Sequence, residues 1–217
     1  GPDGSSVIPN TGYGIDIQDG SSGNIVGGTN AIDRNVISGN TLSGIRIAET
    51  GSSNNEVLGN YIGLDASGLL NRSNASDGVV IELGASSNTI GGGASGARNV
   101  ISGNAGDGVR IRDVASTNNT VQGNYIGTDA TGTAGIGNAT GVFFDSAGTG
   151  NILGVNGDGI NDEYEGNLIS GNMTNGGVRV ATTPGVVVAG NWIGLNASGN
   201  AAIPNIDTGI GAGGLSV

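Results

Sequence analysis

The loop at residues 156–166 gathers the side chains best suited to bind a metal ion. It reads Asn-Gly-Asp-Gly-Ile-Asn-Asp-Glu-Tyr-Glu-Gly. It places Asp158, Asp162 and Glu163 close together, and Glu165 follows two residues after Glu163. Carboxylate and amide oxygens are ligands that Ca²⁺ prefers, and the glycines allow the loop to wrap around an ion. The spacing is not that of an EF-hand, and a solvated acidic loop is the favoured alternative. Calcium is the one cofactor that the sequence suggests.

Composition limits the other chemistry that this chain can perform. It contains neither His nor Cys, which excludes imidazole and thiolate metal ligands and the nucleophiles that depend on them. Catalysis is left to Asp, Glu, Arg or Tyr. A formal net charge of −11 repels nucleic acid and anionic membranes. No apolar run approaches the roughly 18 residues of a membrane span, so we expect no nucleic-acid partner and no membrane insertion by this segment.

Three aromatic residues occupy one place in a repeated phrase, Asn-(Tyr/Trp)-Ile-Gly. They are Tyr61, Tyr125 and Trp192. Strand alternation turns them outward, where they can stack on sugars or simply cover a turn. Each phrase is followed by a turn that begins with Asp65, Asp129 or Asn196. The turns are most simply structural, although three aligned side chains could also present hydrogen-bonding groups to a sugar.

These residues belong to a repeat array. A second phrase, Asn-Val-Ile-Ser-Gly-Asn, occurs at 35–40 and 99–104 and, with Leu for Val, at 167–172. The two phrases together place Asn at one equivalent position six times, as Asn35, Asn60, Asn99, Asn124, Asn167 and Asn191. Such internal repetition is typical of a solenoid. We expect these Asn side chains to be buried in an internal ladder, and Asn60, Asn124 and Asn191 to make sharp bends with left-handed backbone angles.

Short strands with one buried face recur along the chain. Each opens with Gly and alternating apolar residues, and they start near residues 14, 44, 78, 108, 141, 177 and 209. A second and a third strand follow in each interval, and extra residues alternate between two loop positions. These observations predict an all-β, right-handed parallel β-helix solenoid of about six coils, with three strands per coil and an internal Asn ladder. An antiparallel β-sandwich is the main rival, but it has no reason for a 64-residue repeat.

This organisation predicts one domain, residues 14–217, after a lead-in at 1–13 whose first residues, Gly1-Pro2, resemble a tag scar. Ile residues of the first and third strands should stack inside it. The last strand begins a seventh coil that has no amphipathic cap after it. Uncapped β-helix ends expose unpaired backbone groups. We therefore expect either further repeats of the same protein or end-to-end self-association.

Three phrases resemble those of a known family. Asn-Val-Ile-Ser-Gly-Asn, Asn-Tyr-Ile-Gly-Thr-Asp-Ala-Thr-Gly-Thr and Asn-Thr-Ile-Gly-Gly look like phrases of the right-handed parallel β-helix repeat proteins, which are pectate-lyase-like in architecture. The similarity spans about residues 12–210. The family occurs in large secreted and surface-attached bacterial proteins, so the resemblance implies a secreted or cell-surface location. Similar arrays serve as stalks, adhesin shafts, carbohydrate-binding surfaces and scaffolds of polysaccharide lyases and epimerases, so activity is not implied.

The outward positions of the first strands carry four of the seven Arg residues. A predicted ligand-binding face consists of Arg46, Arg110, Phe143 and Arg179, together with Tyr61, Tyr125 and Trp192. In pectate-lyase-like enzymes, which this arrangement resembles, Arg abstracts a proton while Asp-bound calcium neutralises a uronate. The nearest catalytic candidates here are Arg110 or Arg112 beside Glu82 and Asp145. Cross-strand charge pairs on a solvated sheet, each contributing under about 1 kcal/mol, are the favoured alternative.

Three function classes follow, in order of preference. The first is a structural or adhesive segment of a larger extracytoplasmic protein that presents a carbohydrate-binding face. The second is a carbohydrate-binding module, and the third is a calcium-dependent polysaccharide lyase or epimerase. A catalytic role is the less favoured alternative, because no cluster of carboxylates and basic residues is evident. The predicted partner is a polysaccharide.

Overall fold

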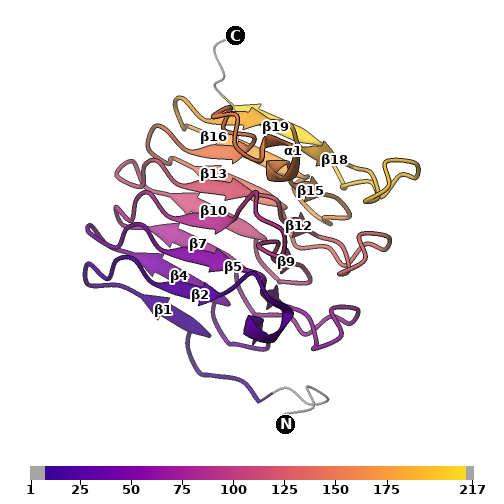
Figure 1. Cartoon of the computed structure of the whole chain (residues 1–217), viewed down its shortest axis with the longest axis horizontal. Coiled ribbons are helices and arrows are strands. Elements are labelled where there is room, and N and C mark those ends of the chain that lie inside the picture. Colours follow the sequence, from indigo (N-terminus) through magenta and orange to yellow (C-terminus); the bar gives the residue numbers. More distant parts are fainter. Residues whose placement is uncertain (1–7, 214–217) are drawn as a thin grey trace.

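The chain forms three parallel β-sheets that wind into a solenoid of about six right-handed coils (Figure 1). The structure is a computed structural model, and it describes residues 8–213; part of the predicted lead-in and residues 214–217 lie outside this range. Every strand pair is parallel, and each strand pairs with its equivalent in the next coil. The predicted fold class is confirmed. No helix in the described part of the chain combines the length and apolar character that crossing a membrane requires.

Each coil contributes one strand to each sheet, and seven strands build the first sheet. The first sheet contains β1 (Ile15–Ile17), β4 (Ile45–Ala48), β7 (Val79–Glu82), β10 (Val109–Arg112), β13 (Val142–Asp145), β16 (Val178–Ala181) and β19 (Ile210–Gly213). The second contains β2 (Ile25–Gly27), β5 (Glu56–Leu58), β8 (Thr89–Gly91), β11 (Thr120–Gln122), β14 (Ile152–Gly154) and β17 (Val187–Ala189). The third contains β3 (Val36–Ile37), β6 (Tyr61–Ile62), β9 (Val100–Ile101), β12 (Tyr125–Ile126), β15 (Leu168–Ile169) and β18 (Trp192–Ile193).

Stacked aliphatic side chains fill the interior. One continuous cluster includes the predicted inward residues of the first strands, such as Ile47 and Ile111, and those of the third strands, such as Ile62 and Ile126. Ile15 and Ile193, in the outermost coils, are only partly buried and pack against this cluster. With few aromatic residues available, the fold buries its apolar surface by stacking mainly Ile and Val side chains from coil to coil rather than by enclosing a wide centre.

Three Asn ladders run along the solenoid, one at each corner of the coil. The first is the predicted ladder, in which Asn Nδ2 of one coil donates to Oδ1 of the next at 2.8–3.2 Å. The sequence analysis missed two others. The second ladder contains Asn24, Asn55, Asn88, Asn119 and Asn151, and the third contains Asn10, Asn40, Asn74, Asn104, Asn138, Asn172 and Asn205. In each ladder the amide also donates to backbone carbonyls, so the side chains take part in the hydrogen bonding of the backbone at the bends.

Two details of the first ladder differ from expectation. Four of its members are buried, but Asn35 is exposed and Asn191 is half-buried, because they lie in the outermost coils. The left-handed backbone angles belong to the glycines before the bends, which are Gly59, Gly123 and Gly190, with φ between 65° and 70°. A Cβ at Gly59 would lie 2.2 Å from the carbonyl oxygen of Gly28, so no larger side chain fits there.

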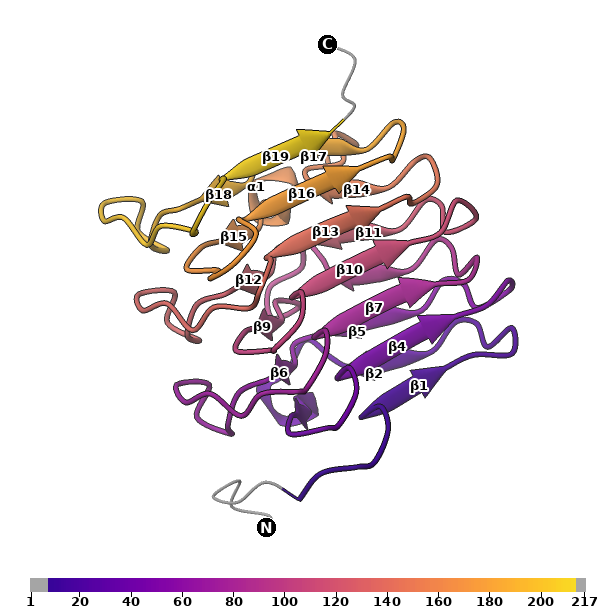
Figure 2. The ribbon, with the colours of Figure 1, turned by 180° about the vertical axis from the view of Figure 1, so that it is seen from behind.

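The alternating insertions form two rows of loops. Those at 64–77, 128–140 and 195–208 project beside the third sheet and stack on one another (Figure 2). Backbone bonds join them, since the amide of Ala130 donates to the carbonyl of Gly68 and the amide of Ala197 to that of Gly132, both at 2.9 Å. The other row precedes the third-sheet strands, and it includes η1 (Ala31–Asp33), residues 93–98 and α1 (Asp162–Glu165). Both rows border the outer face of the third sheet.

Candidate functional site

The outer face of the third sheet carries alternating aliphatic and aromatic side chains. Its register aligns Val36, Tyr61, Val100, Tyr125, Leu168 and Trp192 in one row. The Trp192 side chain is 48% exposed, and the two Tyr side chains are half-buried. The predicted outward direction of this aromatic stripe (Tyr61, Tyr125 and Trp192) is therefore confirmed. Its members lie two strands apart, roughly 10 Å, because neighbouring strands are separated by about 4.8 Å.

An Arg side chain stacks on each Tyr of the aromatic stripe. The guanidinium carbon of Arg34 lies 4.1 Å from the centre of the Tyr61 ring, and that of Arg98 lies 4.1 Å from the centre of the Tyr125 ring. Nε of Arg34 donates to the carbonyl of Gly59 at 3.0 Å, and Nε of Arg98 to that of Gly123 at 3.3 Å. The ring and the carbonyl together fix each guanidinium on the surface.

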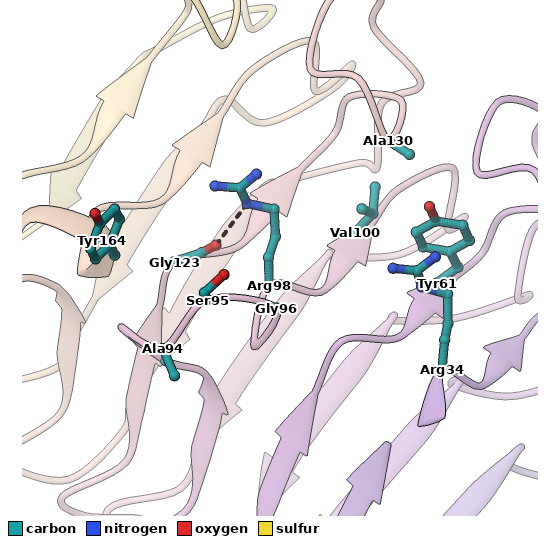
Figure 3. A pocket seen from close by; sticks show the side chains of 11 residues that line it. Arg34, Tyr61, Ala94, Ser95, Gly96, Arg98, Val100, Gly123, Ala130 and Tyr164 are labelled. Carbon is teal, nitrogen blue, oxygen red and sulfur yellow. Dashed lines mark hydrogen bonds between the residues drawn. The ribbon is translucent and has the colours of Figure 1, made fainter. Parts of the chain in front are cut away.

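A cavity of 460 Å³ opens between the two Arg–Tyr pairs, above Val100. We call it the Arg cavity; it is lined by Arg34, Tyr61, Gly92, Ala94, Ser95, Gly96, Arg98, Val100, Gly123, Ala130 and Tyr164. Figure 3 shows Arg98 on one side of Val100 and the Arg34–Tyr61 pair on the other. Loop 93–98, α1 and loop 128–140 each contribute to its walls. The insertions thus build a groove on the third sheet, and its size is typical of a small-molecule site.

A second cavity of 320 Å³ continues the groove toward Trp192. It lies above Leu168, the residue aligned with Val100 two coils further on, and shares Arg98 and Tyr164 with the Arg cavity. Asp162 and Glu163 also line it, so its walls carry both charges. The two cavities form one continuous surface along the aromatic stripe.

The side chains of the three aligned turn residues, Asp65, Asp129 and Asn196, accept hydrogen bonds within their own loops. Oδ1 of Asp65 accepts the backbone N–H groups of Leu69 and Leu70, both at 3.1 Å. The equivalent atoms of Asp129 and Asn196 accept the corresponding pairs of N–H groups. The favoured structural role of these turns agrees with this geometry, because the same oxygen atom closes each loop.

The outward face of the first sheet holds a network of ion pairs. Glu82 lies between two cations, accepting from Nε of Arg46 and from Nε of Arg112, each at 2.6 Å. Arg110 donates to Asp145 at 2.5 Å and stacks on Phe143, whose other neighbour, Arg179, lies 4.7 Å from the ring centre. The predicted ligand-binding face is therefore divided between two sheets. Arg46, Arg110, Phe143 and Arg179 lie on the first sheet, whereas Tyr61, Tyr125 and Trp192 lie on the third. On the first sheet, Arg46 and Arg110 are paired with carboxylates of the same sheet.

The charge state of these groups does not favour proton abstraction. Burial opposes the charged forms of Glu82 and Arg110, but hydrogen bonds and opposite charges outweigh it. The hydrogen bonds from Arg46 and Arg112 hold the pKa of Glu82 below its usual value, and the bond to Asp145 with nearby carboxylates raises the pKa of Arg110. An Arg that acts as a base needs a lowered pKa. The geometry agrees with the alternative of cross-strand charge pairs.

The acidic loop brings together three carboxylates. Asp158, Asp162 and Glu165 place one oxygen each within 4.8 Å of one another. The group contains Glu165 where the sequence predicted Glu163, which instead lines the second cavity. The Glu165 side chain is buried, and its Oε2 accepts the N–H of Asn156 at 2.9 Å. The three carboxylates are ligands of the type that Ca²⁺ prefers, although the hydrogen bond from Asn156 to Glu165 stabilises the loop without an ion.

Calcium should raise the melting temperature if this trio binds it, because ligand binding to the folded state stabilises that state. We expect thermal unfolding in Ca²⁺ to occur several degrees higher than in chelator, and Asp162→Asn to abolish the difference. Glu56→Gln removes an exposed carboxylate elsewhere and should keep the difference. Equal melting temperatures of the unchanged protein in Ca²⁺ and in chelator would leave the loop as an acidic surface.

Sequence reasoning missed Arg34, Arg98 and Tyr164 as site residues. A signal for the two Arg residues was present, because both stand directly before Asn-Val-Ile-Ser-Gly-Asn and lie 64 residues apart, like the phrases themselves. It also missed Asp77 and Asp107, which are buried and stand directly before the Gly residues that precede β7 and β10.

Searches of protein-family profiles, of curated proteins and of solved structures found no match to this chain. The chain is a right-handed parallel β-solenoid, and its resemblance to pectate-lyase-like proteins stays a prediction.

Proposed function

We propose that this chain is a rigid β-solenoid segment of an extracytoplasmic protein and that it binds a polysaccharide along the third sheet. The observation that carries the proposal is the groove, in which a row of aromatic rings is combined with two connected cavities. Aromatic rings offer sugars an apolar surface, and polar groups around them give specificity. The groove is elongated along the solenoid axis, as a site for a polymer needs to be.

The alternatives differ in what they require of the first sheet. A lyase or epimerase needs a base and carboxylates that face a substrate, whereas Arg110, Arg112, Glu82 and Asp145 are paired with one another. A free-standing carbohydrate-binding module and an adhesive segment would both bind sugar in the same groove, so the groove does not distinguish them. Self-association through the ends of the solenoid also stays a prediction. We therefore place binding on the third sheet and give the first sheet a structural role.

Trp192 provides a direct measurement of binding, because it is the single Trp and lies in the groove. We expect a bound polysaccharide to change its fluorescence. Trp192→Phe keeps an aromatic ring, whereas Trp192→Ala and Tyr125→Ala should each weaken binding about three- to tenfold, from about 0.5–1.5 kcal/mol lost per ring. Calorimetry serves for variants that lack Trp.

Tyr13→Ala is the matched control, since Tyr13 stacks near Arg46 at the first sheet. It should leave affinity unchanged. If Tyr13→Ala weakens binding and the groove variants do not, the binding face lies on the first sheet. Absorbance from unsaturated sugar products, followed in the same samples, would instead reveal a lyase.

A further inference from the structure

The Arg cavity has a charge opposite to that of the whole chain. The formal net charge is −11, yet the charged residues that line this cavity are Arg34 and Arg98, and no carboxylate is among them. Apart from Arg98, loop 93–98 contributes only small side chains to the rim, and Ala94, Ser95 and Gly96 are exposed. The cavity is therefore open to solvent and locally cationic on an otherwise acidic protein.

The two Arg residues keep donors that the protein does not use. Each commits Nε to a backbone carbonyl, and within residues 8–213 neither forms an ion pair. The contrast is with Arg46, Arg110 and Arg112, each of which is paired with a carboxylate. Stacking on Tyr fixes the guanidinium plane in advance, so little side-chain entropy is lost when its terminal nitrogens bind an anion.

The repeat shows that the cationic character is local. Position 34 is Arg, its equivalent at 98 is Arg, and the third equivalent, before Asn167, is Gly166. The cavity beside Gly166 is lined by Asp162 and Glu163 as well as Arg98. An anionic group is thus favoured above Val100 and disfavoured near Trp192, where an uncharged sugar face can meet the indole ring.

We propose that the Arg cavity binds the anionic group of a sugar unit, a carboxylate or a sulfate ester, between Arg34 and Arg98. The groove then selects acidic polysaccharides over neutral ones. This inference rests on the proposed function and adds the chemical class of its ligand. The contacts are charge-assisted hydrogen bonds from the terminal guanidinium nitrogens, which are strong and favour planar or tetrahedral oxyanions.

The test compares polymers that differ in charge but share a backbone. One pair is a polyuronate and its methyl ester, and the other is a sulfated glucan and its neutral parent. We expect the unchanged protein to bind at least one charged polymer at least tenfold more tightly than its neutral partner at low salt. The pair that shows the difference identifies carboxylate or sulfate as the source. The preference should decrease as salt is added.

Variants assign that preference to the cavity. Arg34→Gln and Arg98→Gln should each weaken binding of the charged polymer about tenfold and leave the neutral polymer unaffected. Arg72→Gln is the control, because it makes the same charge change in loop 64–77, where Arg72 also lacks an ion pair among the described residues. Melting temperatures show whether each variant remains folded.

The outcomes separate this inference from the proposed function. If neutral and charged polymers bind equally and Trp192→Ala weakens both, the groove binds sugars and the anionic site is wrong. If the preference exists but Arg72→Gln weakens it as much as Arg98→Gln, general electrostatics explain it, and the site is again wrong. If no polymer of either pair binds, the proposed function fails together with this inference.

Discussion

Replacing Asn124 with Ala should lower the free energy of unfolding by about 2–4 kcal/mol. Asn124 lies in the middle of the first ladder and is 0% exposed. Its Oδ1 accepts the backbone and side-chain N–H groups of Asn99 at 3.2 and 2.9 Å. Its Nδ2 donates to the carbonyls of Ile90 and Gln122, both at 2.8 Å. An Ala at this position leaves several buried groups without a hydrogen-bond partner. Each such group costs about 1–3 kcal/mol, and the cost is smaller where neighbouring groups or water can replace the lost bond.

The end of the same ladder provides the matched control. Asn35 is exposed, and its side chain donates only to Oδ1 of Asn60 among the described residues. Asn35→Ala should cost less than about 1 kcal/mol, because Oδ1 of Asn60 still accepts the backbone N–H of Asn35 at 3.1 Å. Urea unfolding of both variants, followed by far-ultraviolet circular dichroism, measures the difference. Equal costs at the two positions would show that burial does not determine the strength of the ladder.

A substitution by Asp separates hydrogen bonding from side-chain shape. Asn124→Asp keeps an acceptor toward Asn99 but loses the donor to Ile90 and Gln122, and it introduces a charge into a buried row. At neutral pH we expect Asn124→Asp to be more destabilising than Asn124→Ala. At pH 4 we expect it to be less destabilising than Asn124→Ala, because the carboxyl can then be protonated and donate a hydrogen bond. The reverse order would indicate that the ladder residues serve as packing units.

The coil architecture could be predicted because it depends on features that repeat. Identical phrases occur in equivalent positions, so the alternation of inward Ile residues and the first Asn ladder follow from spacing alone. The third ladder was missed because only alternate members, Asn40, Asn104 and Asn172, stand in a repeated phrase, and the members between them stand in changing sequence. Asn74 and Asn138 lie at the ends of variable loops, for example, whereas Asn60 and Asn124 stand in a fixed phrase. Because the insertions differ in length, the spacing between successive ladder Asn residues is irregular in the sequence, although the residues are aligned in the structure.

The site was less predictable because loops determine it. Arg34 and Arg98 each stack on a Tyr that stands 27 residues later in the sequence, a contact between neighbouring coils that the sequence of their own loops does not reveal. The exchange of Glu163 for Glu165 in the acidic trio has a similar origin. The direction of each carboxylate depends on the four-residue α1, which spacing did not predict. Strand register is repeated from coil to coil, whereas the conformation of a loop such as 156–166 is specific to one insertion.

Replacing Asp77 with Asn should stabilise the protein at neutral pH by up to about 3 kcal/mol. Asp77 is 7% exposed, and its Oδ1 accepts the N–H of Asp107 at 2.7 Å. Burial raises the pKa of Asp77 to about 6. The hydrogen bond from the N–H of Asp107 opposes this shift, the carboxylate of Asp107 adds to it, and Arg110 and Arg112 oppose it more weakly. Asn retains the acceptor for Asp107 and removes the buried charge. The magnitude follows from an ordinary value of 3.8, since each tenfold change in ionisation is worth about 1.4 kcal/mol.

The sign of the pH dependence follows from the direction of the shift. Because the pKa is higher in the folded state, the unfolded chain releases the proton first, and stability from this group is lost as pH rises from about 4 to about 6. Below pH 4, Asp77 is protonated in both states, and Asp77→Asn should match the unchanged protein. Above about pH 6 the full difference should be present. Urea midpoints measured at pH 4, 5, 6 and 8 give the profile.

Asp65 supplies a control with the opposite sign. Burial opposes its charge, but hydrogen bonds from Ser67 and from the backbone of Leu70 and Leu69 outweigh that effect and lower its pKa. Asp65→Asn should therefore destabilise the protein at neutral pH, and the penalty should shrink as pH falls below the ordinary value of an Asp. A profile for Asp77→Asn that is flat between pH 4 and 8 would show that the stacked carboxyls of Asp77 and Asp107 are solvated well enough to ionise normally, despite their burial before β7 and β10.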